Sequence, residues 1–553
     1  MMTRTLTLDK FGQPPAPWWL RVSTSPVLLT FQGGGAKGVV HVGALAAVEE
    51  VGLRVQGAAG TSAGAMMAAL VAARYTSREI FNLDTGQNIL DTLGGERGLK
   101  RPTQFFGRRG WFTIALIRRL IKVFSGWRGR ASLCVAAGGL IVLIWEWPHW
   151  AAAVVAAAAV GSYFLVRWTL RGIASVAKVR DFVDRALAAK LGMARGDVTF
   201  RDLASYDALP LKIVATNVSG RCVEVFSVER TPDTAVADAV AASICLPFVF
   251  VPWRFKRRRG AGVGAREDDC AFVDGGVMSN LPVWTFDAER RQQPDLVTIA
   301  FSIEASREGP SKKGHWLGGM LESIVAGSLE IHLRAVERML FVPIPTDLKL
   351  FQFDATRETL RLDALEAREA VAVRLHEGLT STPTVLESAC EELLVTVRDL
   401  FATKSGDWFP AGDVPTLKVA VAVRPAATYG DLAVPYHAGY GEERPVVEPG
   451  LLVRAWEAHE ASYTLFTGGA WPGDHWLICF PVSRREEEGI LPTFEGRIEK
   501  PLVIMIEADA EVDAENEEAF EAFVSQLSEF VIDFVEEFGL YDAVQRSTST
   551  PWE

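Results

Sequence analysis

Histidine and cysteine are scarce in this sequence, and neither is arranged in a pattern that holds a metal. The 553 residues include eight histidines and six cysteines. No two cysteines form a Cys-x-x-Cys pair, and no histidine lies at metal-ligand spacing from them. We therefore expect reduced thiols in a cytosolic compartment, no metal site and no cofactor.

Several other features are missing. Residues Met1–Trp19 have no apolar core, which argues against a secretory signal. The formal net charge of −11 argues against a nucleic-acid partner. Basic residues nevertheless gather in 97–130 and in Arg254–Arg259, which is expected to be a loop. Such a loop either touches anionic head groups or is a solvated charged loop.

The length and the apolar content point to several domains and to a membrane. Hydrophobic residues make up 49% of the chain and the mean hydropathy is +0.15, both high for a purely soluble protein. A chain of 553 residues is too long for one core. Proline and glycine near Phe409–Val414 mark a boundary. We expect an N-terminal extension (1–24), a large domain (25–400) and a smaller one (410–553).

The order of elements near the N-terminus is typical of a parallel α/β sheet. Val27–Phe31 and Leu53–Ala59 are short apolar runs that predict buried strands. Each is followed by a glycine-containing turn and then by a predicted helix, the first over Val39–Glu50. Strand, turn and helix twice in succession favour parallel strands.

Two apolar runs, Leu133–Trp145 and Trp150–Val166, predict a helical hairpin inserted at 131–167. A spanning helix needs about 20 apolar residues. Arginines flank the pair at both ends, which favours a transmembrane hairpin whose ends, with the catalytic domain, face the cytoplasm. The alternative is a hairpin buried in a large soluble core.

The motif Gly60-Thr61-Ser62-Ala63-Gly64 follows the second predicted strand. A nucleophilic serine on a tight strand-to-helix turn needs small neighbours, which Gly60 and Gly64 supply. The start of the next helix also favours developing negative charge. Ser62 is therefore a candidate nucleophile, although the same motif also occurs in ordinary turns.

A second glycine-rich turn, Gly33-Gly34-Gly35-Ala36-Lys37-Gly38, follows the first strand. Consecutive glycines allow backbone amides to converge on an oxyanion. The string also fits the dinucleotide fingerprint, but no acidic residue ends the strand at Val55–Ala59. A phosphate-binding loop is disfavoured as well, since Lys37 is followed by Gly38 and not by serine or threonine.

Asp274-Gly275-Gly276 supplies a carboxylate just past another apolar stretch. A serine hydroxyl needs a base at neutral pH, and histidine is the usual one. His41 is expected to be a packed core residue, and His315 is only a weak candidate. Asp274 can take the proton directly if the site holds it in place.

Together these three motifs resemble the patatin-like phospholipase family over residues 25–400. The likeness extends to Asn280, Pro282 and the stretch Ala239–Phe250. It implies a three-layer α/β sandwich with a mostly parallel central sheet. It also implies a metal-independent acyl hydrolase acting on lipid esters. By this resemblance, Ser62 is expected to be the nucleophile and Asp274 the base, and water is expected to hydrolyse the acyl-enzyme.

The resemblance also places the oxyanion hole at Gly33, Gly34, Gly35, Lys37 and Gly38, the nucleophile elbow at Gly60 and Gly64, and the Asp-Gly-Gly turn at Gly275 and Gly276.

The last 140 or so residues resemble a GAF-type sensor domain. Pro449–Trp456, Ile478–Val482 and Leu502–Ala508 followed by a long helix suit that pattern. The resemblance implies a regulatory domain that binds a small molecule or forms a homodimer.

The leading hypothesis is a membrane-tethered phospholipase whose partner is a phospholipid membrane. One alternative is a catalytically inactive patatin fold that serves as a membrane sensor or scaffold. Another is a soluble esterase or thioesterase.

Overall fold

The computed structural model describes most of the chain. The described residues are 26–93, 102–107, 110–113, 160–161, 172–247, 249–259, 266–293, 296–305, 339–404, 416–423, 433–440, 449–466, 475–482, 493–494, 497–498, 502–509 and 517–546.

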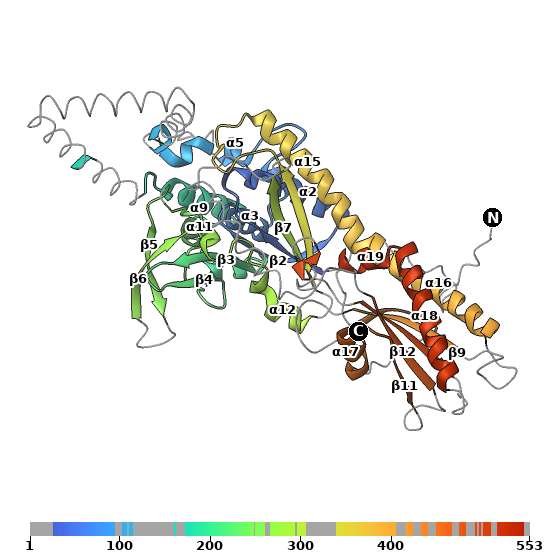
Figure 1. Ribbon diagram of the computed structural model, residues 1–553. Helices are drawn as coiled ribbons and strands as arrows, with labels where there is room; N and C mark the ends of the chain where they lie inside the picture. Colours follow the sequence, from blue (N-terminus) through green and yellow to red (C-terminus); the bar gives the residue numbers. More distant parts are fainter. Residues whose placement is uncertain are drawn as a thin grey trace, which may run out of the picture.

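A mixed sheet of eight strands lies at the centre of the larger part of the chain (Figure 1). Its order is β5-β6-β3-β2-β1-β7-β8, and β4 pairs with β3. Five strands run parallel: β1 (Pro26–Phe31), β2 (Arg54–Thr61), β3 (Leu211–Asn217), β7 (Val297–Ala305) and β8 (Met339–Thr346). Three strands form antiparallel pairs: β4 (Cys222–Phe226) and β6 (Arg266–Val273) each pair with β3, and β5 (Trp253–Arg259) pairs with β6. The predicted α/β class is confirmed.

The two faces of this sheet pack against different layers. Val27, Leu29 and Phe31 of β1 belong to the main core, whereas Leu28 packs with Phe286 on the other face. The helices of this part are α2 (Val40–Val51), α3 (Ala63–Ala72), α4 (Ser77–Ile80), α5 (Ile89–Leu93), α9 (Ala177–Leu191), α10 (Phe200–Ser205), α11 (Val236–Ile244), α12 (Asp287–Gln292) and α15 (Arg357–His376).

Helix α15 lies directly against α2. A Cβ on Gly43 of α2 would overlap the carbonyl oxygen of Ala364, so only glycine permits this approach. Ala364, Ala367, Val371 and Leu375 form the buried face of α15 at helical spacing. The contact holds α2, which begins just after the glycine-rich turn.

The basic run Arg254–Arg259 was expected to be a loop, and that expectation is wrong. It lies in β5, which pairs antiparallel with β6. Trp253 and Phe255 are half-buried against the core, while Arg254 and Lys256 are exposed. The alternation is that of a strand with one solvated face, and the high density of charge obscures it in the sequence.

A second, five-stranded antiparallel sheet has the order β10-β9-β15-β12-β11. Its strands are β9 (Thr416–Val423), β10 (Ala433–Ala438), β11 (Ser462–Phe466), β12 (His475–Val482) and β15 (Leu502–Asp509), and β13 (Thr493–Phe494) pairs with β14 (Arg497–Ile498). Helix α17 (Pro449–Ala458) covers one face. Helices α16 (Thr382–Lys404), α18 (Glu517–Glu537) and α19 (Leu540–Arg546) cover the other.

Helix α16 belongs to this second core although it precedes the predicted boundary. Leu386, Leu393, Val397 and Phe401 pack with β9 and α18. One π-helical turn, Glu377–Ser381, joins α15 to α16. The two cores therefore meet along one nearly continuous helical segment (Figure 1).

The predicted hairpin 131–167 and the N-terminal extension 1–24 lie outside the described residues, apart from 160–161. Among the helices that the structure describes, none is both long and apolar enough to cross a bilayer. Gly110 and Ala174, on either side of the insertion, lie together: a Cβ on Gly110 would stand 2.9 Å from the Ala174 Cβ.

Candidate active site

Ser62 occupies a sharp turn between β2 and α3. Its backbone angles, φ 54° and ψ −123°, are rare for a non-glycine residue and store about 1–3 kcal/mol of strain. A Cβ on Gly60 would overlap the backbone of Gly64, and one on Gly64 would overlap the carbonyl of Phe31. The turn therefore closes only with glycine at both positions, as expected for a nucleophile elbow.

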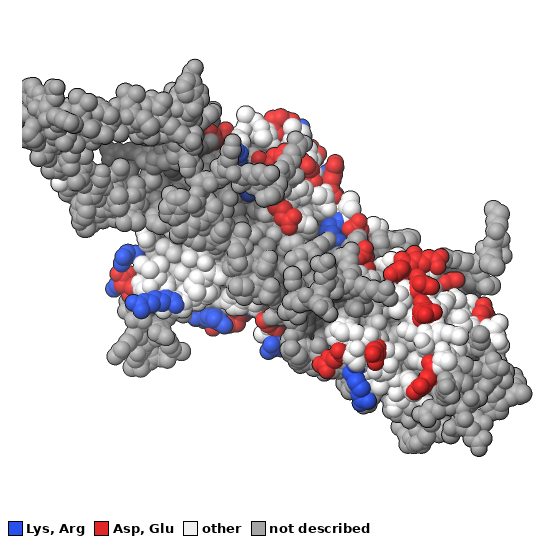
Figure 2. Space-filling view, in the orientation of Figure 1, with Lys and Arg blue, Asp and Glu red and all other residues white. Residues whose placement is uncertain are grey.

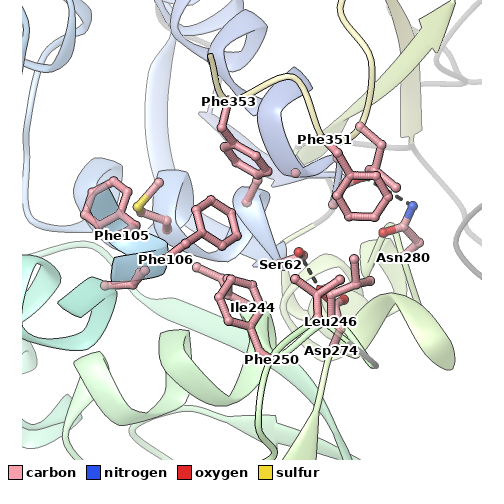
Figure 3. Close-up of a pocket in the computed structure, with 18 residues that line it drawn as sticks. Ser62, Phe105, Phe106, Ile244, Leu246, Phe250, Asp274, Asn280, Phe351 and Phe353 are labelled. Carbon is pink, nitrogen blue, oxygen red and sulfur yellow. Dashed lines mark hydrogen bonds between the residues drawn. The ribbon is translucent and has the colours of Figure 1, made fainter. Parts of the chain in front are cut away.

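Asp274 follows β6, which is separated from β2 by a single strand, β3. The Ser62 hydroxyl donates a hydrogen bond of 2.6 Å to Asp274 Oδ2 (Figure 3). The other carboxylate oxygen, Oδ1, accepts the Gly276 amide at 2.7 Å. Gly275 must lack a side chain, because a Cβ there would overlap the Val214 carbonyl. The Asp-Gly-Gly turn thus fixes both carboxylate oxygens.

Burial changes the acidity of this carboxylate. Asp274 is 3% exposed, and loss of hydration raises its pKa from 3.8 to about 6. The hydrogen bonds from Ser62 and Gly276 oppose the rise because they stabilise the anion. The group remains ionised at neutral pH, yet it is a stronger base than an exposed aspartate.

The glycine-rich turn presents two amides with no hydrogen-bond partner among the described residues, those of Gly34 and Gly35. Both residues border the same pocket as Ser62. The Gly33 amide, which the sequence also assigned to the oxyanion hole, donates to the Asn280 carbonyl at 3.1 Å. Gly33 is instead required by space: a Cβ would overlap Asn280 Oδ1 and stand 2.9 Å from Ser62 Cβ.

Lys37 and Gly38 do not border the pocket. The Lys37 amide donates to the Gly34 carbonyl at 3.0 Å, so it is not available to an oxyanion. A Cβ on Gly38 would stand 2.6 Å from the Ala63 Cβ. Both residues close the turn against α3, and their place in the oxyanion hole stays a prediction.

His41 cannot serve as the base. It is fully buried in α2, its Nε2 lies 2.8 Å from the Gln32 carbonyl, and burial lowers its pKa to about 4. It is neutral at physiological pH and packs edge-on against Phe31. His315 lies outside the described residues.

Residues 29–287 match the model of the family described as patatin-like phospholipase. This part of the chain is therefore similar to a patatin-like phospholipase domain. The match spans the glycine-rich turn, the elbow and the Asp-Gly-Gly turn.

Individual proteins similar to this chain are distant. Protein YqhO of Bacillus subtilis (strain 168), described as uncharacterized, is 28% identical over 334 residues, which are 59% of this chain and 90% of YqhO. The structure of VipD from Legionella pneumophila covers 74% of this chain and 81% of its own, with 16% identity and a TM-score of 0.33. ExoU from Pseudomonas aeruginosa, solved in a complex with SpcU, covers 69% and 63%, with 18% identity and a TM-score of 0.29.

The patatin-like domain has an apolar pocket that opens onto Ser62 (Figure 3). It contains about 780 Å³ of free space, part of it open to solvent. Phe106 is central to its wall: it stacks on Phe250 at 5.2 Å and meets Phe353 edge-on at 4.7 Å between ring centroids. The polar side chains that border it are Ser62, Asp274 and Asn280. Such a pocket suits a hydrocarbon chain that ends at one reactive carbonyl.

Sequence reasoning did not identify the residues of this wall. Phe105 and Phe106 come from a short 3-10 helix (Pro102–Phe106) just before the insertion. Leu350, Phe351 and Phe353 come from the loop after β8. None carries a motif, and only the fold brings them to Ser62. No group of three or more metal-binding side chains occurs in the described part of the chain, and a metal-independent reaction stays a prediction.

Proposed function

We propose that this chain hydrolyses fatty-acyl esters of phospholipids, with Ser62 as nucleophile and Asp274 as general base. The observation that carries the proposal is the 2.6 Å hydrogen bond from Ser62 Oγ to a buried carboxylate at the mouth of an apolar pocket. A hydroxyl bonded to its base, beside unused backbone amides, is the arrangement that acyl transfer requires.

The proposed reaction has two steps. Ser62 Oγ attacks the ester carbonyl while Asp274 takes its proton, and the Gly34 and Gly35 amides hold the oxyanion. Asp274 then returns the proton to the leaving alcohol, which leaves an acyl-enzyme. A water molecule attacks this ester, again losing its proton to Asp274. The fatty acid departs and Ser62 recovers its proton. No cofactor takes part in this scheme.

Membrane tethering is part of the proposal. Gly110 and Ala174, which precede and follow the insertion in the chain, lie beside each other, and Trp111 next to Gly110 packs against Phe106 of the pocket wall. Next to them, Phe112 is 69% exposed and Val251 is 47% exposed, and the Val251 amide bonds the Ala174 carbonyl. Exposed apolar groups around a lipid pocket favour contact with a bilayer. With the hairpin in the membrane and the catalytic domain on the cytoplasmic side, a lipid would reach Ser62 directly.

Charge is distributed in a way that suits this orientation. On the face shown in Figure 2, basic side chains predominate at the β5–β6 end, and acidic ones predominate along α15 and over the second core. Arg254 and Lys256 are exposed on β5. We propose that this end meets anionic head groups and that the acidic second core lies away from them.

The second core is proposed to be a GAF-like regulatory domain that binds a small molecule or pairs with a second copy. Its support is the antiparallel sheet covered by helices on both faces. The chain is expected to be active or held inactive according to the state of this domain.

The primary test is fatty-acid release from mixed phosphatidylcholine and phosphatidylglycerol vesicles, with a chelator present. Wild type should release fatty acid, while Ser62→Ala and Asp274→Asn should lose at least about 10³-fold in rate. A fluorophosphonate probe that labels wild type but not Ser62→Ala reports the nucleophile independently of any lipid. Wild type that neither hydrolyses nor labels would support the inactive-scaffold alternative.

The membrane proposal has its own test, vesicle flotation. Val251→Ser should weaken binding to vesicles, whereas Val395→Ser, an equally exposed valine (52%) on α16, should not. Equal binding by both variants would remove this surface from the proposal. Activity on soluble esters with no vesicle binding by wild type would favour the soluble-esterase alternative.

A further inference from the structure

Ser243 lies behind the nucleophile and is completely buried near the end of α11. The Ser62 amide donates to Ser243 Oγ at 2.8 Å. Ser243 Oγ in turn lies 2.6 Å from the Val214 carbonyl. A carbonyl can only accept, so the hydroxyl proton points to Val214 and a lone pair faces the Ser62 amide. The direction of both bonds is fixed.

The end of α11 also holds the backbone of the proposed base, Asp274. The Asp274 amide donates to the Cys245 carbonyl at 2.8 Å. Cys245 follows the last residue of α11, where a carbonyl has no partner within the helix. Ser243 and Cys245 are two residues apart, and they fix the backbones of Ser62 and Asp274, which are 212 residues apart.

The supporting helix is rigid, and the residue it supports is strained. Val236, Ala237, Ala239, Val240, Ala241 and Ala242 of α11 are all 0% exposed. Ser62 sits at φ 54°, a conformation that persists only where surrounding contacts impose it. The hydrogen bond that the Ser62 amide donates to a side chain of this packed helix is such a contact.

Ser243 does not reach the substrate. It does not border the pocket, whereas its neighbours Ile244 and Leu246 do. Any effect of the hydroxyl on hydrolysis must therefore pass through Ser62.

We propose that Ser243 is a positioning residue: with the Cys245 carbonyl, it holds the strained elbow so that Ser62 Oγ stays within hydrogen-bond reach of Asp274. The inference rests on the proposed function, since it assigns Ser243 a part in that reaction. Under this proposal, the end of α11 holds both residues of the catalytic pair, Ser62 and Asp274, in place.

The test compares Ser243→Ala with Thr30→Val in the full-length chain. Thr30 is also 0% exposed, and its hydroxyl bonds the Ile299 carbonyl at 3.2 Å within the same sheet, away from the pocket. The two variants each lose one buried hydroxyl and should lose similar thermal stability. Hydrolysis of a soluble p-nitrophenyl ester then separates them.

Ser243→Ala should lower kcat about 10- to 100-fold with KM within about threefold, while Thr30→Val keeps wild-type kcat. The pH profile is a readout that stability alone does not move. When the elbow relaxes, Asp274 loses the Ser62 hydrogen bond that lowers its pKa, so the profile should shift to higher pH. The kcat of Ser243→Cys, which keeps a weak donor and acceptor, should lie between those of wild type and Ser243→Ala.

Wild-type kcat and an unshifted profile in Ser243→Ala would overturn the proposal. If wild type itself neither hydrolyses esters nor reacts with a fluorophosphonate, the proposed function fails, and the positioning role is decided by a crystal structure of Ser243→Ala. An elbow that leaves its positive φ and separates from Asp274 supports the role, and an unchanged elbow overturns it.

Discussion

The amide of Gly33 donates to the carbonyl of Asn280, and the Asn280 side chain returns a bond from Nδ2 to the Gly33 carbonyl at 3.3 Å. This reciprocal pair ties the start of the glycine-rich turn to the segment that follows Asp274. The amides of Gly34 and Gly35, which border the pocket, have no partner among the described residues.

The glycines of this turn should differ in their tolerance of a methyl group. In Gly33→Ala the Cβ would press on Asn280 and on Ser62 itself, so we expect activity to fall at least about 100-fold. In Gly34→Ala the nearest atom is Ile303 Cδ1 at 2.5 Å, the end of a flexible side chain that can move aside. This variant should keep most activity. Ester hydrolysis at matched folded fraction checks the order, and equal losses would contradict it.

The pH dependence of hydrolysis should report Asp274. The base must be ionised, so kcat/KM should rise about tenfold per unit below pH 6 and level off above it. Initial rates on a soluble ester from pH 4.5 to 8.5 give the curve. A rate that is flat or falls between pH 5 and 7 would exclude Asp274 as the base.

Ionisation of the Asp274 carboxyl group should lower the free energy of unfolding. Its pKa is about 6 in the fold and near 3.8 in the unfolded chain, so the folded state binds the proton more tightly. The contribution of this group to stability is full below pH 3.8, declines as pH rises to 6, and stays low above. Asp274→Asn should therefore be more stable than wild type by up to about 3 kcal/mol at pH 8, and by little at pH 4. Urea unfolding at both pH values tests this, with Ser62→Ala as the control.

Phe106 should set the acyl chain length that the pocket accepts. Replacing it by alanine opens the wall formed with Phe250 and Phe353. Each further methylene that becomes buried is worth about 0.8 kcal/mol, or about fourfold in kcat/KM. The optimum across p-nitrophenyl esters of increasing length should move to longer chains in Phe106→Ala. Phe200→Ala, at a buried position that does not border the pocket, should leave it unchanged.

Whether a C-terminally truncated chain aggregates should depend on whether it still contains α16. A chain that ends at 410 keeps α16 but removes the strands that cover Leu386, Leu393 and Phe401, so it should aggregate. A chain that ends at 381 removes the helix together with its core and should remain monodisperse in gel filtration. Equal behaviour of the two would show that α16 does not depend on the second sheet.

Much of the site could be predicted because its chemistry requires small residues in fixed order. The elbow at Ser62, the glycine-rich turn and Asp274 each follow a strand, and glycine is needed at each for space. The hydrogen-bond directions could not be predicted. Whether the Gly33 amide faces solvent or Asn280 depends on a segment almost 250 residues away.

Other features are set by tertiary packing. The charges of Arg254 and Lys256 suggested a loop, yet pairing with β6 and the half-buried Trp253 and Phe255 make a strand. Phe106 and Phe353 have no local pattern that marks a pocket wall. The boundary expected near residue 410 follows from proline and glycine content, whereas the apolar face of α16 assigns that helix to the second core.

The relative orientation of the two cores depends on the number of residues in the single π-helical turn between α15 and α16. A helix advances 1.5 Å and turns 100° per residue, so one residue added within Glu377–Ser381 would rotate one core by about 100° relative to the other. Helix α15 packs in the first core through Ala364, and helix α16 packs in the second core through Leu393. Neither helix can therefore rotate within its own core to compensate. Insertions at this joint are therefore compatible with the fold only when they restore the phase, at about seven residues for two turns.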